Sequence, residues 1–195
     1  KGYRFRYSLF GEDFVYSPSL RGEHQGRNAA MAVAAALALH QTWKALKKNR
    51  ILLGLSRAEW PGRLEAVSRN PLVILDGAHN EEGANAVRSY VRDFLPRPLT
   101  LVFGIMKDKP IRQVAGILFP LARVVIITTF PYKRAAAPEK IKDEARKLGK
   151  RLILEPDTKK AIQRALEITP RHGAVLISGS LFLVGEAKRQ FPEWA

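Results

Sequence analysis

The stretch PLVILDGAHNEEGANAVRSYVRDF, residues 71–94, indicates the fold class. Its LVIL run at 72–75 is continuously apolar, which is typical of a strand covered on both faces. After the turn DGAHN, apolar residues recur at the spacing of one helix face, at Ala84, Val87, Val91 and Phe94. A buried strand followed directly by an amphipathic helix is the repeating unit of a parallel α/β sheet.

The same alternation continues to the end of the sequence. Further apolar runs of strand length occur at 99–103, 122–128, 151–154 and 173–178. The helical patterns between them begin near Pro110, Pro138 and Thr158, and Thr158 is expected to cap its helix. These units predict an α/β domain with a mostly parallel sheet and flanking helices. In such a sheet, ligands bind at the carboxyl ends of the strands.

The first sixty residues have a different pattern. YRFRYSL, residues 3–9, alternates aromatic and polar side chains, and FVYS, residues 14–17, follows a Gly-Glu-Asp turn, so a β-hairpin is predicted. The helix formers of AAMAVAAALALHQTWKAL, residues 29–46, predict a helix with Asn28 as its N-cap. A second, shorter helix is expected before Pro61, where the Pro-Gly pair indicates a domain boundary.

The composition excludes several functional classes. The 195 residues include 46% hydrophobic residues and no cysteine, so disulfides, thiolate metal sites and cysteine nucleophiles are ruled out. No apolar run approaches the ~20 residues that a membrane span needs, and the first residues lack the apolar block of a secretory signal. A cytoplasmic location without membrane contact is therefore expected.

The net charge of +15 arises from 33 Lys and Arg against 18 Asp and Glu. Such a charge raises the possibility of a nucleic-acid partner. The basic residues are spread along the chain, however, and between Tyr132 and Arg164 eleven of them alternate with five acidic ones. We expect no specific nucleic-acid ligand. A basic, non-enzymatic α/β module that binds nucleic acid or a protein partner stays as the alternative.

Three motifs contain candidate ligand-binding residues, and each also has an ordinary structural interpretation. In GEHQGRNAA, Asn28 offers an amide that can pair with a purine, or it is a plain N-cap. In WPGRLE, Arg63 is either an anion ligand or one half of a surface salt bridge. In DGAHN, Asp76 and His79 follow a strand where ligands bind, although Asn80 could equally cap an ordinary turn.

Taken together, these motifs resemble one enzyme family. In order and spacing, GEHQGRNAA, GLSRAEWPGRLE, PLVILDGAHN, LVFGIMKDK and SGSLFLVGE are similar to folylpolyglutamate and dihydrofolate synthases, which are ATP-dependent ligases of the Mur type. The resemblance implies that residues 1–57 are the tail of a central ATPase domain. It also implies that residues 58–195 are a complete C-terminal Rossmann-like domain.

The resemblance also implies roles for particular residues. Asn28, Arg63 and Asp76 match nucleotide-binding residues, Arg63 and His79 match residues needed for catalysis, and no metal ligand is expected in this sequence. ATP would phosphorylate a carboxylate of folate or dihydropteroate, and the amine of L-glutamate would then attack the acyl phosphate. A related Mur or cyanophycin-type ligase with another substrate stays as an alternative.

One part of such an enzyme is missing from the sequence. No G-x-x-x-x-G-K-[ST] motif, the loop that binds nucleotide phosphates, occurs in the 195 residues. The P-loop and the ligands for Mg²⁺ are therefore expected in a central domain that this sequence lacks. The sequence alone is expected to be inactive, and the whole enzyme is expected to be a monomer.

Overall fold

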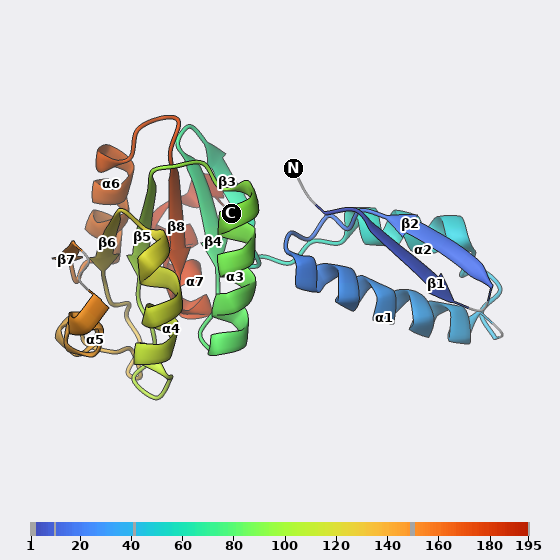
Figure 1. Ribbon diagram of the computed structural model, residues 1–195, viewed down its shortest axis with the longest axis horizontal. Helices are drawn as coiled ribbons and strands as arrows, with labels where there is room; N and C mark the ends of the chain where they lie inside the picture. The colour runs from blue at the N-terminus through green and yellow to red at the C-terminus, as the bar shows by residue number, and fades with distance from the viewer. Residues whose placement is uncertain (1–2, 10, 41, 149–150, 195) are drawn as a thin grey trace. The chain divides into compact units, whose positions relative to one another are not determined.

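The computed structural model describes residues 3–9, 11–40, 42–148 and 151–194. The chain divides into two compact units, unit 1 (Lys1–Pro61) and unit 2 (Gly62–Ala195). Each unit has its own sheet (Figure 1). Among the residues just given, no helix combines the length and the apolar character needed to cross a membrane.

Unit 1 is a β-hairpin with two helices. Strands β1 (Phe5–Leu9) and β2 (Glu12–Tyr16) pair antiparallel, which confirms the predicted hairpin, and α1 (Glu23–Leu39) and α2 (Lys48–Arg57) follow. The Tyr16 hydroxyl donates to the carbonyl oxygen of Gly26 at 2.9 Å. A side chain at Gly26 would overlap the Phe5 ring, so glycine lets α1 lie close to the hairpin. The buried core consists of Phe14, Tyr16, Ala29, Val33 and Ile51.

The prediction that Asn28 caps α1 is wrong. The helix begins five residues earlier, at Glu23, and Gly22 is its N-cap with a φ of 103°. Asn28 therefore lies inside the helix, where its side-chain amide donates to Gln25 Oε1 at 2.9 Å. The polar residues before Asn28 suggested a loop, but they form the first helical turns.

Among its described residues, unit 2 contains a six-stranded sheet and five α-helices. The strands are β3 (Glu65–Arg69), β4 (Leu72–Asp76), β5 (Leu99–Phe103), β6 (Val124–Ile127), β7 (Leu152–Leu154) and β8 (Ala174–Ser178). The helices are α3 (Glu81–Phe94), α4 (Ile111–Leu118), α5 (Pro138–Ala145), α6 (Thr158–Ile168) and α7 (Leu181–Gln190). Single 3₁₀ turns lie at Phe119–Leu121, Arg146–Leu148 and Pro192–Trp194.

The strand order in this sheet is β3-β4-β8-β5-β6-β7, and every pair is parallel except β3 with β4. The predicted mostly parallel sheet with flanking helices is thereby confirmed. Helices α3, α4 and α5 pack in series on one face, and α6 and α7 pack together on the other (Figure 1). The chain steps outward from β4 to β7 and then returns to β8. Crossovers between parallel strands are right-handed, so a connection that runs back across the sheet places its helix on the opposite face. This is why α6, which connects β7 to β8, lies on the other face from α3, α4 and α5.

Two details of unit 2 differ from the sequence-based expectation. Strand β3 has no predicted counterpart, because its five residues carry little apolar pattern and a register shift lies between Ala66 and Ser68. The cap of α6 is Asp157, whose Oδ1 accepts from the Lys160 N–H at 2.8 Å. Thr158 is instead the first helical residue.

Candidate functional site

The neighbouring strands β4 and β8 lead to helices on opposite faces of the sheet. After β4 the chain enters α3 on one face, and after β8 it enters α7 on the other (Figure 1). In open α/β sheets, ligands bind outside the carboxyl ends of the strands at such a reversal. Asp76 and Ser178 are paired in register at this edge. The candidate site of unit 2 therefore starts from these two strand ends.

Asp76 is a buried carboxylate that binds two backbone N–H groups. Its side chain is 6% exposed. Oδ2 accepts from the Leu64 N–H at 2.9 Å, and Oδ1 accepts from the Ala78 N–H at 2.8 Å. Burial raises the pKa of Asp76 to about 6, although these two bonds and the charges of Arg63 and His79 act to lower it.

The turn at residues 62–65 is fastened to the end of β4 by further hydrogen bonds. The Gly77 N–H donates to the carbonyl oxygen of Gly62 at 2.8 Å, and the Gly62 N–H donates to Glu65 Oε2 at 2.8 Å. Glu65 Oε1 also pairs with Lys188 Nζ of α7 at 2.8 Å. Gly62 and Leu64 have φ values of 74° and 47°, so the turn uses left-handed backbone conformations.

Arg63 lies in this turn with its side chain exposed. Within the part of the chain that the structure describes, its guanidinium forms no hydrogen bond or ion pair. Glu65, the nearest acidic residue in the sequence, binds Lys188 instead, and no ion pair of Arg63 occurs among the described residues. An exposed guanidinium without a protein partner is available to an anionic ligand.

His79 and Asn80 complete the DGAHN turn. The half-buried His79 ring places Nδ1 2.8 Å from the carbonyl oxygen of Gly77, and Asn80 Oδ1 accepts from the Gly83 N–H at 2.8 Å as the cap of α3. Asn80 therefore has the ordinary capping role considered for it. The structure brings Arg63, Asp76 and His79 to one edge of unit 2, whereas Asn28 belongs to unit 1.

The loop after β8 lies at the same edge of the sheet, because β8 pairs with β4. Ser180 is 3% exposed and caps α7 by accepting from the Phe182 N–H at 3.1 Å. The Ser178 hydroxyl is buried and has no hydrogen-bond partner among the described residues. Gly179, with a φ of 114°, has no room for a side chain, because a Cβ would lie 2.5 Å from the Gly104 carbonyl oxygen. The sequence motif SGS therefore forms a closely packed loop.

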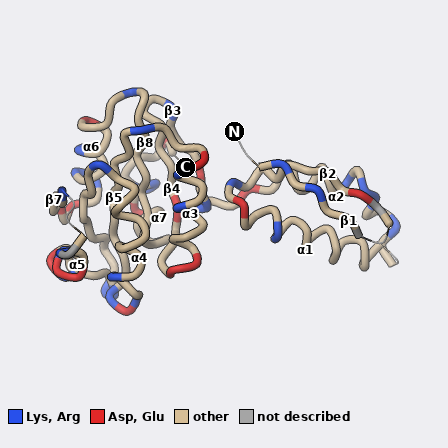
Figure 2. The backbone as a smooth tube through the Cα atoms, in the orientation of Figure 1, with Lys and Arg blue, Asp and Glu red and all other residues tan. Residues whose placement is uncertain are grey.

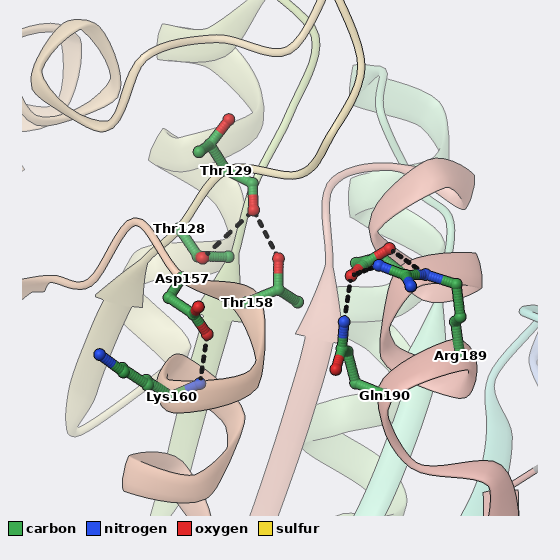
Figure 3. Close-up of polar contacts among 8 residues, drawn as sticks. Thr128, Thr129, Asp157, Thr158, Lys160, Arg189 and Gln190 are labelled. Atoms are coloured by element: carbon green, nitrogen blue, oxygen red, sulfur yellow. Dashed lines mark hydrogen bonds and ion pairs between the residues drawn. The ribbon is translucent and has the colours of Figure 1, made fainter.

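Figure 3 shows a second polar cluster, which has no counterpart in the sequence-based expectations. The Thr158 hydroxyl donates to the Thr129 carbonyl oxygen at 2.6 Å, and Arg189 donates two hydrogen bonds to Glu186, at 2.7 and 2.9 Å. A cavity of about 360 Å³ lies beside them, where β6 and β7 end. These residues come from three distant segments and form no motif, so no sequence signal marks the cluster.

The described residues contain no group of three His, Asp or Glu side chains that could hold a metal ion. At the carboxyl ends of β4 and β8, unit 2 presents the Arg63 guanidinium, the His79 imidazole and the hydrogen-bonded backbone around Asp76. Such groups can bind an anion, orient it and transfer a proton. The chemistry that unit 2 supports is therefore that of anionic substrates.

Comparison with known proteins identifies relatives that match most of the chain. Residues 62–181 match the family described as Mur ligase, glutamate ligase domain. Dihydrofolate synthase/folylpolyglutamate synthase of Bacillus subtilis is 32% identical over 174 residues, which cover 88% of this chain and 40% of that protein. The chain therefore spans about 40% of the length of this relative.

Solved structures agree with the sequence match. Folylpolyglutamate synthase of Mycobacterium tuberculosis, complexed with ADP and AMPPCP, has a TM-score of 0.81 and 26% identity over 96% of this chain and 47% of its own. The Thermotoga maritima folylpolyglutamate synthase has a TM-score of 0.75 and 30% identity over 98% of this chain and 45% of its own. This chain belongs to the Mur ligase family and carries the family's glutamate ligase domain over residues 62–181.

Proposed function

We propose that the chain is the C-terminal part of an ATP-dependent ligase that adds L-glutamate to folate or dihydropteroate. The observation that carries the proposal is the Arg63 guanidinium, which has no hydrogen-bond or ion-pair partner among the described residues and lies beside Asp76 and His79 at the strand edge of a glutamate ligase domain. The relatives named as folylpolyglutamate and dihydrofolate synthases support the substrate class.

The proposed reaction proceeds through anionic species at every stage. ATP phosphorylates the acceptor carboxylate, the amine of glutamate attacks the acyl phosphate, and phosphate leaves. Arg63 binds the nucleotide and stabilises the negative charge that develops on the transferred phosphoryl group, because its planar donors suit several oxygens at once. In this proposal Asp76 belongs to the nucleotide-binding side of unit 2, and His79 acts in the same turn.

The rest of the nucleotide site is proposed to lie in a central domain, of which residues 1–57 are the tail. Asn28 is proposed as a nucleotide-binding residue of that domain. The P-loop and the Mg²⁺ ligands belong to the part of the central domain that this sequence lacks, and Mg²⁺ enters there with ATP. In this proposal the complete enzyme is cytoplasmic and monomeric, and the 195-residue chain alone is inactive.

The distribution of charge gives no support to a nucleic-acid interface. Figure 2 shows Lys and Arg interspersed with Asp and Glu in the loops and helices of unit 2. Asp108, for example, binds Arg134 at 2.7 Å, and Glu186 binds Arg189 at 2.7 Å. A positive field of this kind suits small anionic substrates as well as it suits phosphodiesters.

The test is a ligase assay on the complete protein, with this chain joined to its own P-loop-bearing part. We expect ADP release that requires both L-glutamate and either dihydropteroate or a reduced folate, with the amide product identified by mass spectrometry. D-glutamate and a Mur-type nucleotide-linked peptide are the control substrates. Turnover only with the Mur-type acceptor, or no ADP release with any acceptor, would contradict the proposal.

A further inference from the structure

We infer that Asp76 is a positioning residue that fixes Arg63 by holding the turn at residues 62–65 through its backbone. This inference deepens the proposed function and rests on it wherever Arg63 is said to bind the nucleotide. Resemblance to the family implies that Asp76 contacts the nucleotide itself. The geometry assigns it a role through the protein backbone.

Both carboxylate oxygens of Asp76 are already engaged. Oδ2 accepts from the Leu64 N–H and Oδ1 from the Ala78 N–H, at 2.9 and 2.8 Å. The side chain is 6% exposed, so little of it is accessible to a ligand. One carboxylate therefore joins two turns, one that carries Arg63 and one that carries His79.

The conformation of the turn explains why it needs such an anchor. Leu64 has a φ of 47°, in a region that residues with a side chain seldom occupy. Its side chain is 1% exposed and packs in the core, and its N–H is bound by Asp76. These contacts hold the residue after Arg63 in place.

The residue before Arg63 is fixed as well. Gly62 accepts from the Gly77 N–H and donates to Glu65, and Glu65 is in turn held by Lys188. Arg63 is therefore the one residue of the turn that is exposed between two anchored neighbours. A guanidinium that starts from a fixed backbone loses less conformational freedom when it binds a phosphoryl group.

Hydrogen exchange on the 195-residue chain tests the anchor without any ligand. Asp76→Asn offers one oxygen and one NH₂ group, so only one of the two backbone N–H groups keeps its acceptor. We expect the amide of Leu64 or of Ala78 to exchange at least about tenfold faster than in the unsubstituted chain. Unchanged protection at both amides would overturn the inference.

Asp157→Asn is the matched control, because Asp157 also accepts a backbone N–H, that of Lys160, at the cap of α6. Asparagine keeps the one oxygen that this single N–H needs, so exchange at Lys160, Leu64 and Ala78 should all stay as in the unsubstituted chain. If Asp76→Asn fails to fold, the unsubstituted chain still decides the question. Leu64 and Ala78 amides that exchange at the rate of an unstructured peptide would overturn the inference.

A double-mutant cycle in the complete ligase tests whether Asp76 acts through Arg63. Asp76→Asn should raise the KM for ATP at least about fivefold when Arg63 is present and change it less than twofold when Arg63 is replaced by alanine. Equal effects in both backgrounds would overturn the positioning role. Suppose that Arg63→Ala does not change ATP turnover, but Asp76→Asn still speeds amide exchange at Leu64 or Ala78. The proposed role of Arg63 in the reaction would then be wrong, whereas the hydrogen bonds of Asp76 to the turn would still be supported.

Discussion

The backbone N–H of Leu64 donates to Asp76 Oδ2 at 2.9 Å, twelve positions away in the sequence, and this bond joins the first turn of unit 2 to the end of β4. An ionisable group thus lies inside a hydrogen-bonded turn, where it is 6% exposed. Burial disfavours the charged form more than the two N–H donors and the neighbouring cations favour it. Ionising Asp76 in the folded chain therefore costs free energy, and this cost depends on pH.

The first prediction concerns the pH dependence of stability. The pKa of Asp76 rises from 3.8 to about 6 on folding, so between these values the native chain holds a proton that the unfolded chain has lost. The free energy of unfolding should fall as pH rises through this window and level off above it, by about 3 kcal/mol from this group. Urea unfolding of the chain and of Asp76→Asn from pH 4 to 8 measures the effect. Parallel curves for the two proteins would contradict it.

The second prediction compares two glycines of unit 2. Gly179→Ala forces a side chain into a φ of 114° and against the Gly104 carbonyl oxygen, so it should lower the free energy of unfolding by about 3 kcal/mol or more. Gly116→Ala, in α4, meets open space and should raise that energy by up to about 1 kcal/mol. Equal losses in the two variants would show that the loop after β8 is looser than the structure indicates.

The sequence was sufficient to predict the five parallel strands of unit 2 and the helices between them, because each apolar run alternates with an amphipathic helix. It did not show that β8 lies between β4 and β5, since this insertion depends on long-range pairing such as that of Asp76 with Ser178. Strand β3 was missed for a related reason. Its place is set by β4 and by the pair between Glu65 and Lys188, 123 positions apart.

At the candidate site, the motifs indicated which residues lie at the strand ends but not the contacts between them. DGAHN pointed to Asp76 and His79, and PGR pointed to Arg63. The hydrogen bond from the Leu64 N–H to Asp76 could not be predicted, because nothing in the sequence indicates that Leu64 adopts a positive φ. Asn28 was misread as a cap because the polar residues before it resemble a loop, although they lie within α1. Its proposed contact with ATP stays a prediction.

The third prediction is that the 195-residue chain binds ATP weakly and hydrolyses none. The sequence has no P-loop, so most phosphate contacts are missing. Affinity should be in the millimolar range, which corresponds to about 4 kcal/mol. Isothermal titration and a phosphate-release assay measure the two quantities. Micromolar binding, or turnover by the chain alone, would mean that the nucleotide site does not depend on a central domain.

The fourth prediction concerns the net charge of +15. If the positive charge provides only nonspecific attraction to anions, duplex DNA should bind weakly and without sequence preference. This binding should then vanish near physiological salt. The slope of log K against log salt should be about one unit per phosphate neutralised. Fluorescence anisotropy at several salt concentrations measures this. Submicromolar binding to one particular sequence at physiological salt would favour the nucleic-acid alternative.

The last prediction concerns Arg63 in the complete ligase. Lysine keeps the charge but loses the planar, paired donors that suit a phosphoryl group. If Arg63 acts mainly in the transition state, Arg63→Lys should lower kcat by on the order of 10²-fold, or about 2.7 kcal/mol, while the KM for glutamate changes less, because glutamate enters after the acyl phosphate forms. Lys188→Arg, which keeps the charge that pairs with Glu65, is the control for the packing of the same turn. Unchanged turnover in Arg63→Lys, with folding verified by thermal melting, would show that Arg63 is not a catalytic residue.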